Sequence, residues 1–205
     1  MTLRLFLVRH GETESNRQGL ALGRADVPLN DLGREQAAQV AAALADEPLL
    51  AVYASPLQRT VDTAKPVAAA HDLPVSIEPA FIEMDVGEVE GLTFTELRER
   101  YPQLLETWAS ADGPQSAMPG GERLLDVQLR ATEAVRALAA RHAEGAVCVV
   151  THNFVILSLL ADVLAIDLAS FRRLRHAVGA ITTLELRHGR HTRVLRLNDT
   201  CHLSA

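Results

Sequence analysis

Residues 5–16 read LFLVRHGETESN, and this stretch decides how the chain is organised. The apolar run over residues 3–8 predicts a strand that is buried on both sides. It leads directly into Arg9, His10 and Gly11. Two polar side chains and a glycine at the end of a buried strand are typical of a binding or catalytic site rather than of a core. We expect Gly11 to let the backbone come close to a ligand.

Helix and strand patterns alternate along the rest of the chain. Helices are predicted from Asn30 or Asp31 to about residue 46 and over residues 57–71, 122–142 and 153–164, and strands over residues 51–54, 74–77, 146–151, 180–186 and 192–197. The last two strands form a hairpin that turns at residues 188–190. In the helix over residues 122–142, the residues expected to face the core are Leu125, Leu129, Val135 and Leu138. The alternation predicts an α/β fold, a three-layer α/β/α sandwich around a mostly parallel sheet with one antiparallel edge strand.

We expect one domain over residues 1–205, with a lid or insertion at about residues 84–122. The insertion starts with MDVGEVEG, holds a short helix near residues 95–100, and ends in a loop rich in glycine and proline. Irregular segments of this length often carry function, so this one is expected to lie over the active site.

Composition excludes some classes of protein. The 205 residues carry a formal net charge of −6, which is not typical of a nucleic-acid-binding protein. No apolar run approaches ~18 residues, so no membrane span is expected. The two cysteines, Cys148 and Cys201, give no disulfide framework, and the N-terminus has no signal-peptide pattern. A cytoplasmic protein is expected.

Polar residues follow each of the first four predicted strands. They are Arg9 and His10, then Ser55 and Arg59, then Glu83 and Asp85, then Thr151 and His152. Because the carboxyl ends of parallel strands meet at one edge of a sheet, we expect these side chains to converge. Two guanidinium groups and two helix N-termini at that edge match a tetrahedral oxyanion, so the set predicts a phosphate site.

Histidine can attack phosphorus when its ring is neutral and is fixed by a hydrogen bond on the other nitrogen. A cationic neighbourhood lowers the histidine pKa and keeps that lone pair free. The leaving group needs a proton donor, for which Glu83 is suited if burial or acidic neighbours raise its pKa, and Asp85 or Glu88 is close enough to serve instead. Taken alone, Arg59 could be a surface residue, and His152 could cap a helix.

Four motifs in order carry a resemblance to a known family. They are RHGE at residues 9–12 with Asn16, SPLQRT at residues 55–60, E-x-x-x-G-x-x-E-G at residues 83–91, and TH at residues 151–152. Together they resemble the histidine phosphatase superfamily, in its phosphoglycerate-mutase-like branch, over nearly the whole chain. The resemblance implies that His10 is the nucleophile and forms a phosphohistidine, with no metal and no cofactor.

The resemblance also assigns the other roles. It implies that Arg9, Arg59 and His152 hold the phosphoryl oxygens and stabilise the transition state. Asn16 would bind the phosphate, and Glu83 would be the proton donor and later the base for water.

The chain departs from the family pattern at three places. Ser15 stands where the family commonly has Trp, Leu22 precedes Gly23 where many members have Gln, and Asn153 follows the second histidine in place of Gly. One phosphate contact is therefore not expected at Leu22. Gly23 and the backbone N–H of Asn153 remain candidates for binding the phosphate or substrate.

Mutases of the family share an insertion after the acidic residue, at the position of Glu83, that is longer than the one in this chain. This chain instead has MDVGEVEGLTFTEL at residues 84–97, which resembles the phosphatase branch. We therefore expect a metal-independent phosphomonoesterase that acts on small phosphorylated metabolites. PGGER at residues 119–123 and the tail NDTCHL resemble broad-specificity and glucosyl-3-phosphoglycerate-type phosphatases.

Two alternatives to the phosphatase stay open. One is a cofactor-dependent phosphoglycerate mutase, and the other is a non-catalytic relative that binds phosphorylated ligands. A homodimer is also open, because dimers are common among similar proteins. Outside the motifs, Arg175 and His176 in FRRLRHA are interpreted as a solvated helix end, and the alternative is a rim that attracts anionic substrates.

Overall fold

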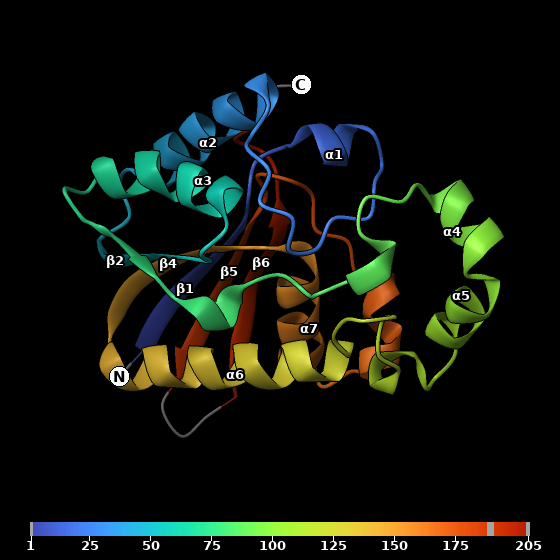
Figure 1. Cartoon of the computed structure of the whole chain (residues 1–205). Coiled ribbons are helices and arrows are strands. Elements are labelled where there is room, and N and C mark those ends of the chain that lie inside the picture. The colour runs from blue at the N-terminus through green and yellow to red at the C-terminus, as the bar shows by residue number, and fades with distance from the viewer. Residues whose placement is uncertain (1, 188–190, 204–205) are drawn as a thin grey trace.

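Six strands form one sheet in the order β3-β2-β4-β1-β5-β6 (Figure 1). The structure is a computed structural model that describes residues 2–187 and 191–203. The strands are β1 Thr2–Arg9, β2 Leu49–Ala54, β3 Val75–Ile77, β4 Gly145–Thr151, β5 Ile181–Arg187 and β6 Arg193–Asp199. The α-helices are α1 Glu14–Arg17, α2 Asp31–Leu44, α3 Gln58–Ala69, α4 Phe94–Arg100, α5 Pro102–Ala109, α6 Leu124–Arg141 and α7 Asn153–Val163. Short 3₁₀ helices are η1 Pro79–Phe81, η2 Gly87–Val89, η3 Gly113–Gln115 and η4 Leu168–Arg173.

The sheet is mostly parallel. β1 pairs in parallel with β4, β4 with β2, and β2 with β3, whereas β5 runs antiparallel to β1 and β6 antiparallel to β5. The predicted parallel sheet with an antiparallel strand near the C-terminus is confirmed; β5 lies next to β1, and β6 takes the edge. The predicted turn at residues 188–190 lies outside the described residues.

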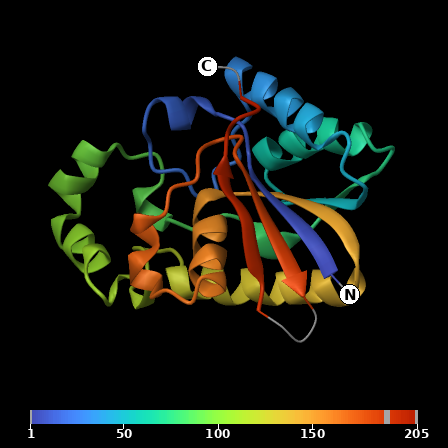
Figure 2. The same cartoon turned by 180° about the vertical axis from the view of Figure 1, so that it is seen from behind.

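Helices cover both faces of the sheet, as expected for three layers (Figures 1 and 2). Leu5 and Leu7 of β1 belong to the core under α6 and α7, and Phe6 and Val8 belong to the core under α2 and α3. Both faces of β1 are therefore buried, which explains why its sequence is apolar without alternation.

Helix α6 turns a different side toward the sheet from the one predicted. Its buried residues are Leu124, Val127, Ala131, Ala134 and Leu138. Leu138 faces the core as expected, but the prediction for Leu129 was wrong, because that side chain is 60% exposed. The buried side carries two alanines beside its larger residues, so the positions of the leucines alone did not indicate the packing face.

The carboxyl ends of the parallel strands lie at one edge. Arg9 is the register partner of Thr151, and Ala54 is the partner of Val150. The His10 N–H donates to the Thr151 carbonyl at 3.0 Å. The Thr151 hydroxyl donates to the carbonyl of Phe81 at 2.7 Å, which ties the segment before Glu83 to the same edge.

Residues 84–122 hold η2, α4, α5 and η3, at one end of the sheet beyond α7 (Figure 1). The predicted short helix near residues 95–100 corresponds to α4, and α5 was not predicted. Trp108 of α5 packs edge-on against Phe154 of α7 and Phe171 of η4, with ring centroids 5.9 and 5.8 Å apart.

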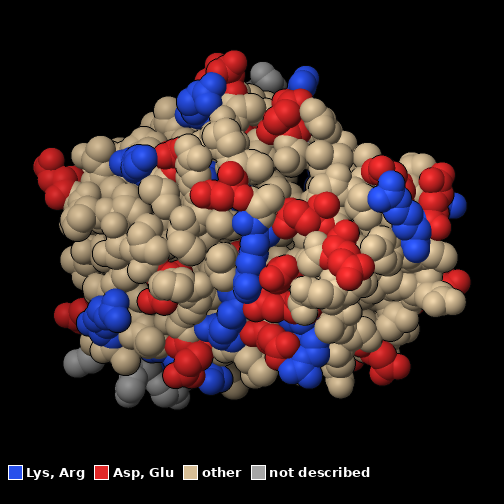
Figure 3. Space-filling model, in the orientation of Figure 1, with Lys and Arg blue, Asp and Glu red and all other residues tan. Residues whose placement is uncertain are grey.

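The surface carries charges of both signs. On the face drawn in Figure 3, acidic and basic side chains lie next to each other in a band at the centre. Within residues 2–187 and 191–203, no helix has the length and apolarity needed to cross a membrane.

Candidate active site

His10 lies at the carboxyl edge of the sheet, directly after β1, and is buried. Its Nδ1–H donates to the carbonyl of Gly11 at 2.7 Å, which fixes the ring and leaves the lone pair on Nε2. Burial, reinforced by the charges of Arg59 and Arg9, holds the pKa of His10 well below its ordinary value of 6.5. The ring is therefore neutral at physiological pH and has the form that a nucleophile requires.

His152 faces His10 from the end of β4. The two ring centroids are 5.3 Å apart, with the ring planes at 61°. The Nε2 atom of His152 lies 2.7 Å from the hydroxyl oxygen of Ser55, the residue after β2. Burial is the main cause that lowers the pKa of His152, followed by the charge of Arg59. Three strand ends are thus joined through two imidazole rings and one hydroxyl.

Arg59 reaches the same place from α3 and is fully buried. Its Nη1 and Nη2 donate to the carbonyls of Ala25 and Gly23, each at 2.7 Å. Arg9 donates through Nη1 to the carbonyl of His176 at 2.6 Å. Burial, as the largest cause, lowers the pKa of Arg9 to about 10.

Three buried nitrogen atoms of these side chains lack a hydrogen-bond partner among the described residues. They are Nε of Arg9, Nε of Arg59 and Nδ1 of His152. Buried charges and donors normally have partners, because leaving them unpaired costs several kcal/mol. A multivalent oxyanion between the two guanidinium groups would satisfy these atoms, so the geometry fits a phosphoryl group.

Glu83 supplies a carboxyl group to this set and is only 3% exposed. Its Oε1 accepts the Met84 N–H at 2.8 Å, and its Oε2 accepts the Phe154 N–H at 3.3 Å. Burial raises the pKa of Glu83 and outweighs these amides and the charge of Arg59. The two other acids proposed for its role have different partners: Asp85 accepts the Gly87 N–H at 2.9 Å, and Glu88 accepts the Tyr101 hydroxyl at 3.2 Å.

Asn16 and Asn153 lie in a polar hollow of about 430 Å³ that Arg9 and Arg175 also line. The Asn153 Oδ1 accepts from Arg9 Nη1 at 3.2 Å. The Asn16 Oδ1 accepts the Thr13 N–H at 3.2 Å, so its NH₂ group is the one that could bind a ligand. Gly23 is engaged differently. Its N–H donates to Glu90 at 2.7 Å and its carbonyl accepts from Arg59, so Gly23 orients Arg59 rather than offering a free N–H.

A family model for the histidine phosphatase superfamily (branch 1) matches residues 5–200. The chain belongs to this superfamily. It is 33% identical over 201 residues to phosphoserine phosphatase 1 of Hydrogenobacter thermophilus, a match that covers 98% of this chain and 94% of that protein. It is 34% identical over 170 residues to a glucosyl-3-phosphoglycerate phosphatase of Mycolicibacterium vanbaalenii, covering 80% and 75% of the two chains. The solved structure of Bacillus stearothermophilus YhfR superposes with a TM-score of 0.90 at 31% identity and covers 98% and 100%.

In this histidine phosphatase, Glu90 has a positioning role that the sequence did not reveal. Its carboxylate accepts the N–H groups of Gly23, Arg24 and Ala25 at 2.7, 2.9 and 3.2 Å. The carbonyls of Gly23 and Ala25 in the same loop hold Arg59. The only signal in the sequence was the place of Glu90 in the motif over residues 83–91.

His176 is the clearest correction among the residues near the site. It was interpreted as part of a solvated helix end, but it is buried and its Nε2 lies 2.9 Å from the Thr182 hydroxyl of β5. Its carbonyl accepts from Arg9, so this segment orients a guanidinium of the site. Burial, as the first cause, lowers the pKa of His176 to about 4.

The structure gives a different reason for Gly11 from the one predicted. A side chain on Gly11 would overlap the backbone carbonyl of Gly33, near the start of α2. The close neighbour of Gly11 is thus the backbone of a helix. The contact holds α2 against the loop that follows His10.

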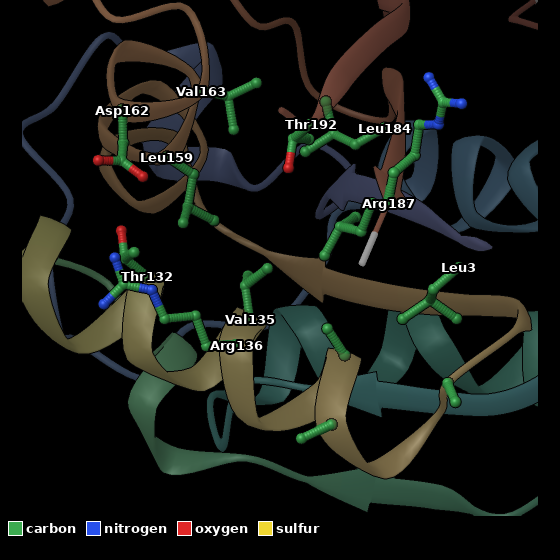
Figure 4. A pocket seen from close by; sticks show the side chains of 14 residues that line it. Leu3, Thr132, Val135, Arg136, Leu159, Asp162, Val163, Leu184, Arg187 and Thr192 are labelled. Atoms are coloured by element: carbon green, nitrogen blue, oxygen red, sulfur yellow. The ribbon is translucent and has the colours of Figure 1, made fainter. Parts of the chain in front are cut away.

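A larger hollow of about 710 Å³ lies elsewhere in the histidine phosphatase, between α6, α7 and β5 (Figure 4). Thr132, Val135, Leu159 and Leu184 are among the side chains that line it (Figure 4). Leu3 at the start of β1 also lines it, so it opens toward the amino end of that strand, away from His10. None of the predicted site residues lines this hollow.

Proposed function

We propose that this histidine phosphatase hydrolyses phosphate monoesters of small metabolites without a metal, through a phosphohistidine on His10. The observation that carries the proposal is the neutral imidazole of His10, fixed through Nδ1 and facing His152. The Nε atoms of Arg9 and Arg59, which have no partner in the described part of the chain, support it, because a phosphoryl group would pair with them. Relatives named phosphoserine phosphatase and glucosyl-3-phosphoglycerate phosphatase are consistent with such substrates.

In the first step, Nε2 of His10 attacks phosphorus, and the bond between phosphorus and the ester oxygen breaks. The protonated carboxyl of Glu83 gives its proton to the departing oxygen, so the alcohol leaves neutral. Arg9, Arg59 and His152 hold the three phosphoryl oxygens and offset the charge in the transition state.

In the second step, the Glu83 carboxylate takes a proton from a water molecule that attacks the phosphohistidine. The bond between phosphorus and Nε2 breaks, inorganic phosphate forms, and His10 and the protonated Glu83 are restored. Asn16 and Asn153 contribute further hydrogen bonds to the phosphate or the substrate.

Residues 1–205 are proposed to form one domain in which residues 84–122 serve as a lid. The packing of Trp108 on Phe154 supports this role, because Phe154 is joined to Glu83 through its N–H. A cytoplasmic location is proposed from the thiols of Cys148 and Cys201, which are both free.

The test is release of inorganic phosphate from p-nitrophenyl phosphate and a panel of metabolite phosphates. His10→Ala should lose at least about a thousandfold in kcat, because the covalent route is gone. His71→Ala is the matched control, since His71 bonds the Leu44 carbonyl at 3.0 Å and takes no part in the site. Wild type briefly exposed to labelled substrate should carry acid-labile phosphate that His10→Ala lacks.

Two other outcomes would replace the proposal. Isomerisation of 3-phosphoglycerate faster than release of phosphate, in the presence of 2,3-bisphosphoglycerate, would make the protein a mutase. Binding of phosphorylated metabolites with no turnover of any ester would make it a phospho-ligand-binding relative.

A further inference from the structure

A small apolar cavity adjoins the catalytic edge. It has a volume of about 260 Å³, below the usual range for drug-sized ligands. Its lining includes Leu22, Val86, Leu104, Trp108, Phe154 and Phe171. These residues come from the loop after α1, the start of the insertion, α5, α7 and η4, so the cavity forms where the insertion meets α7 and η4.

In three of these segments, the lining residue either contacts a catalytic side chain or lies close in sequence to a residue that does. The Phe154 N–H donates to Glu83, and Val86 lies three residues after Glu83. Leu22 precedes Gly23, whose carbonyl holds Arg59. In the proposed mechanism the leaving alcohol takes a proton from Glu83, so its oxygen lies beside that carboxyl. The rest of the alcohol would extend toward the apolar wall of the cavity.

One residue of the wall carries a buried hydrogen-bond donor. Trp108 is only 5% exposed, and its indole N–H has no hydrogen-bond acceptor among the described residues. Such a donor is normally paired when buried, because leaving it unpaired costs about 1–3 kcal/mol. Arg172 lies over the Trp108 ring, 5.6 Å from its centroid, and donates to the Trp108 carbonyl, which holds the indole in place.

We propose that this cavity binds the leaving group of the substrate, and that the preferred esters carry a short apolar chain or ring with an acceptor oxygen near its far end. The inference rests on the proposed phosphatase activity and names the substrate class of the same site. The polar hollow at Arg9 and Arg175 would bind charged groups of a ligand. This cavity would bind apolar groups, because their surface is removed from water there.

The first test is the chain-length dependence of kcat/KM for ethyl, butyl and hexyl phosphate. Their ester oxygens are chemically alike, so differences report binding of the chain. Each methylene that enters the cavity should raise kcat/KM about two- to fourfold, which gives more than about 15-fold from ethyl to hexyl. A flat or falling series would overturn the proposal.

Leu22→Gln tests whether the chain-length dependence of kcat/KM arises in this cavity. It places an amide in the wall and should reduce the hexyl-to-ethyl ratio at least about fivefold. Leu129→Gln is the matched control, because Leu129 is exposed on α6 and takes no part in the cavity. It should leave the ratio unchanged, and equal ratios in wild type and Leu22→Gln would place chain binding elsewhere.

The second test concerns the indole N–H. Alkyl phosphates with a terminal methoxy group are compared with alkyl esters of the same length, in which CH₂ replaces the ether oxygen. At the length that reaches the indole, Trp108→Phe should lower the relative kcat/KM of the ether about fivefold, as expected for one hydrogen bond. If Trp108→Phe leaves the relative kcat/KM of the ether unchanged at every length, the preference for an acceptor oxygen is refuted.

The two failures are distinguishable. If ethyl phosphate, p-nitrophenyl phosphate and the panel of metabolite phosphates all release no phosphate, the proposed phosphatase function fails. If phosphate is released but chain length has no effect on kcat/KM, only the assignment of the cavity fails.

Discussion

Replacing Glu83 by glutamine tests the acid in the proposed mechanism. The carboxyl is 3% exposed, so no bulk water replaces it as proton donor. A positioned general acid contributes about 10²–10⁴-fold. Glu83→Gln should therefore lower kcat for an alkyl phosphate by that factor. It should lower kcat for p-nitrophenyl phosphate by less than about tenfold, because a good leaving group departs with little protonation.

The pH dependence gives an independent check. Burial raises the pKa of Glu83 above its ordinary value of 4.5, and the protonated form is the one that donates. Turnover of alkyl phosphates by wild type should therefore fall as the pH rises through the raised pKa. The lowered pKa of His10 keeps that ring neutral well below pH 6.5, so activity should persist on the acid side. In Glu83→Gln the alkaline decline should disappear.

Two control measurements test whether the effect of Glu83→Gln comes from loss of the acid. Glutamine has one acceptor oxygen where Glu83 uses two, for Met84 and Phe154, so thermal unfolding of Glu83→Gln should be followed alongside activity. Asp85→Asn is the matched variant, since its Oδ1 can still accept the Gly87 N–H, and it should change both substrates equally. Equal losses for the two substrates in Glu83→Gln would refute the acid role. A selective loss in Asp85→Asn would transfer that role to Asp85.

Four further outcomes are expected. Ser55→Ala should reduce kcat about tenfold with little change in KM, because its hydroxyl fixes the His152 ring at 2.7 Å, and an unchanged kcat would argue against positioning. Gly11→Ala should lower the free energy of unfolding by several kcal/mol in denaturant melts, because its methyl overlaps the Gly33 carbonyl. The folded-state pKa of His176, about 4, lies below its ordinary value of 6.5, so the unfolded chain gains the proton first and stability falls between pH 6.5 and 4. His176→Gln should remove about 3 kcal/mol of that fall, measured by denaturant melts at both pH values. Vanadate should inhibit strongly and EDTA should not, and loss of activity in EDTA that is reversed by a divalent metal would contradict the metal-independent route.

Much of the site was predictable because a parallel sheet gathers its strand ends. The motifs after β1, β2 and β4 brought His10, Arg59 and His152 to one edge, and Glu83 was predicted from the segment after β3. That prediction required only the order of apolar runs and the rule that their carboxyl ends meet. The family resemblance added the roles, which remain proposals for this chain.

Other features depended on contacts between distant segments. The burial of His176 follows from its place between Thr182 of β5 and the Arg9 side chain, and its local sequence, FRRLRHA, gives no sign of this. Leu129 is exposed because a different face of α6 packs on the core. The contacts of Glu90 with the loop at residues 23–25 join segments that lie more than sixty residues apart.

The sequence by itself determined the layers of the fold and the identity of the groups at the catalytic edge, because the periodicity of each segment and the order of the segments along the chain can be read directly from it. Only the tertiary structure decided which atoms of those groups remain free. Arg59 uses both Nη atoms on the carbonyls of Gly23 and Ala25, whereas its Nε has no partner among the described residues. The cavity at Trp108 has the same origin, since its walls come from segments that become neighbours only when the chain folds.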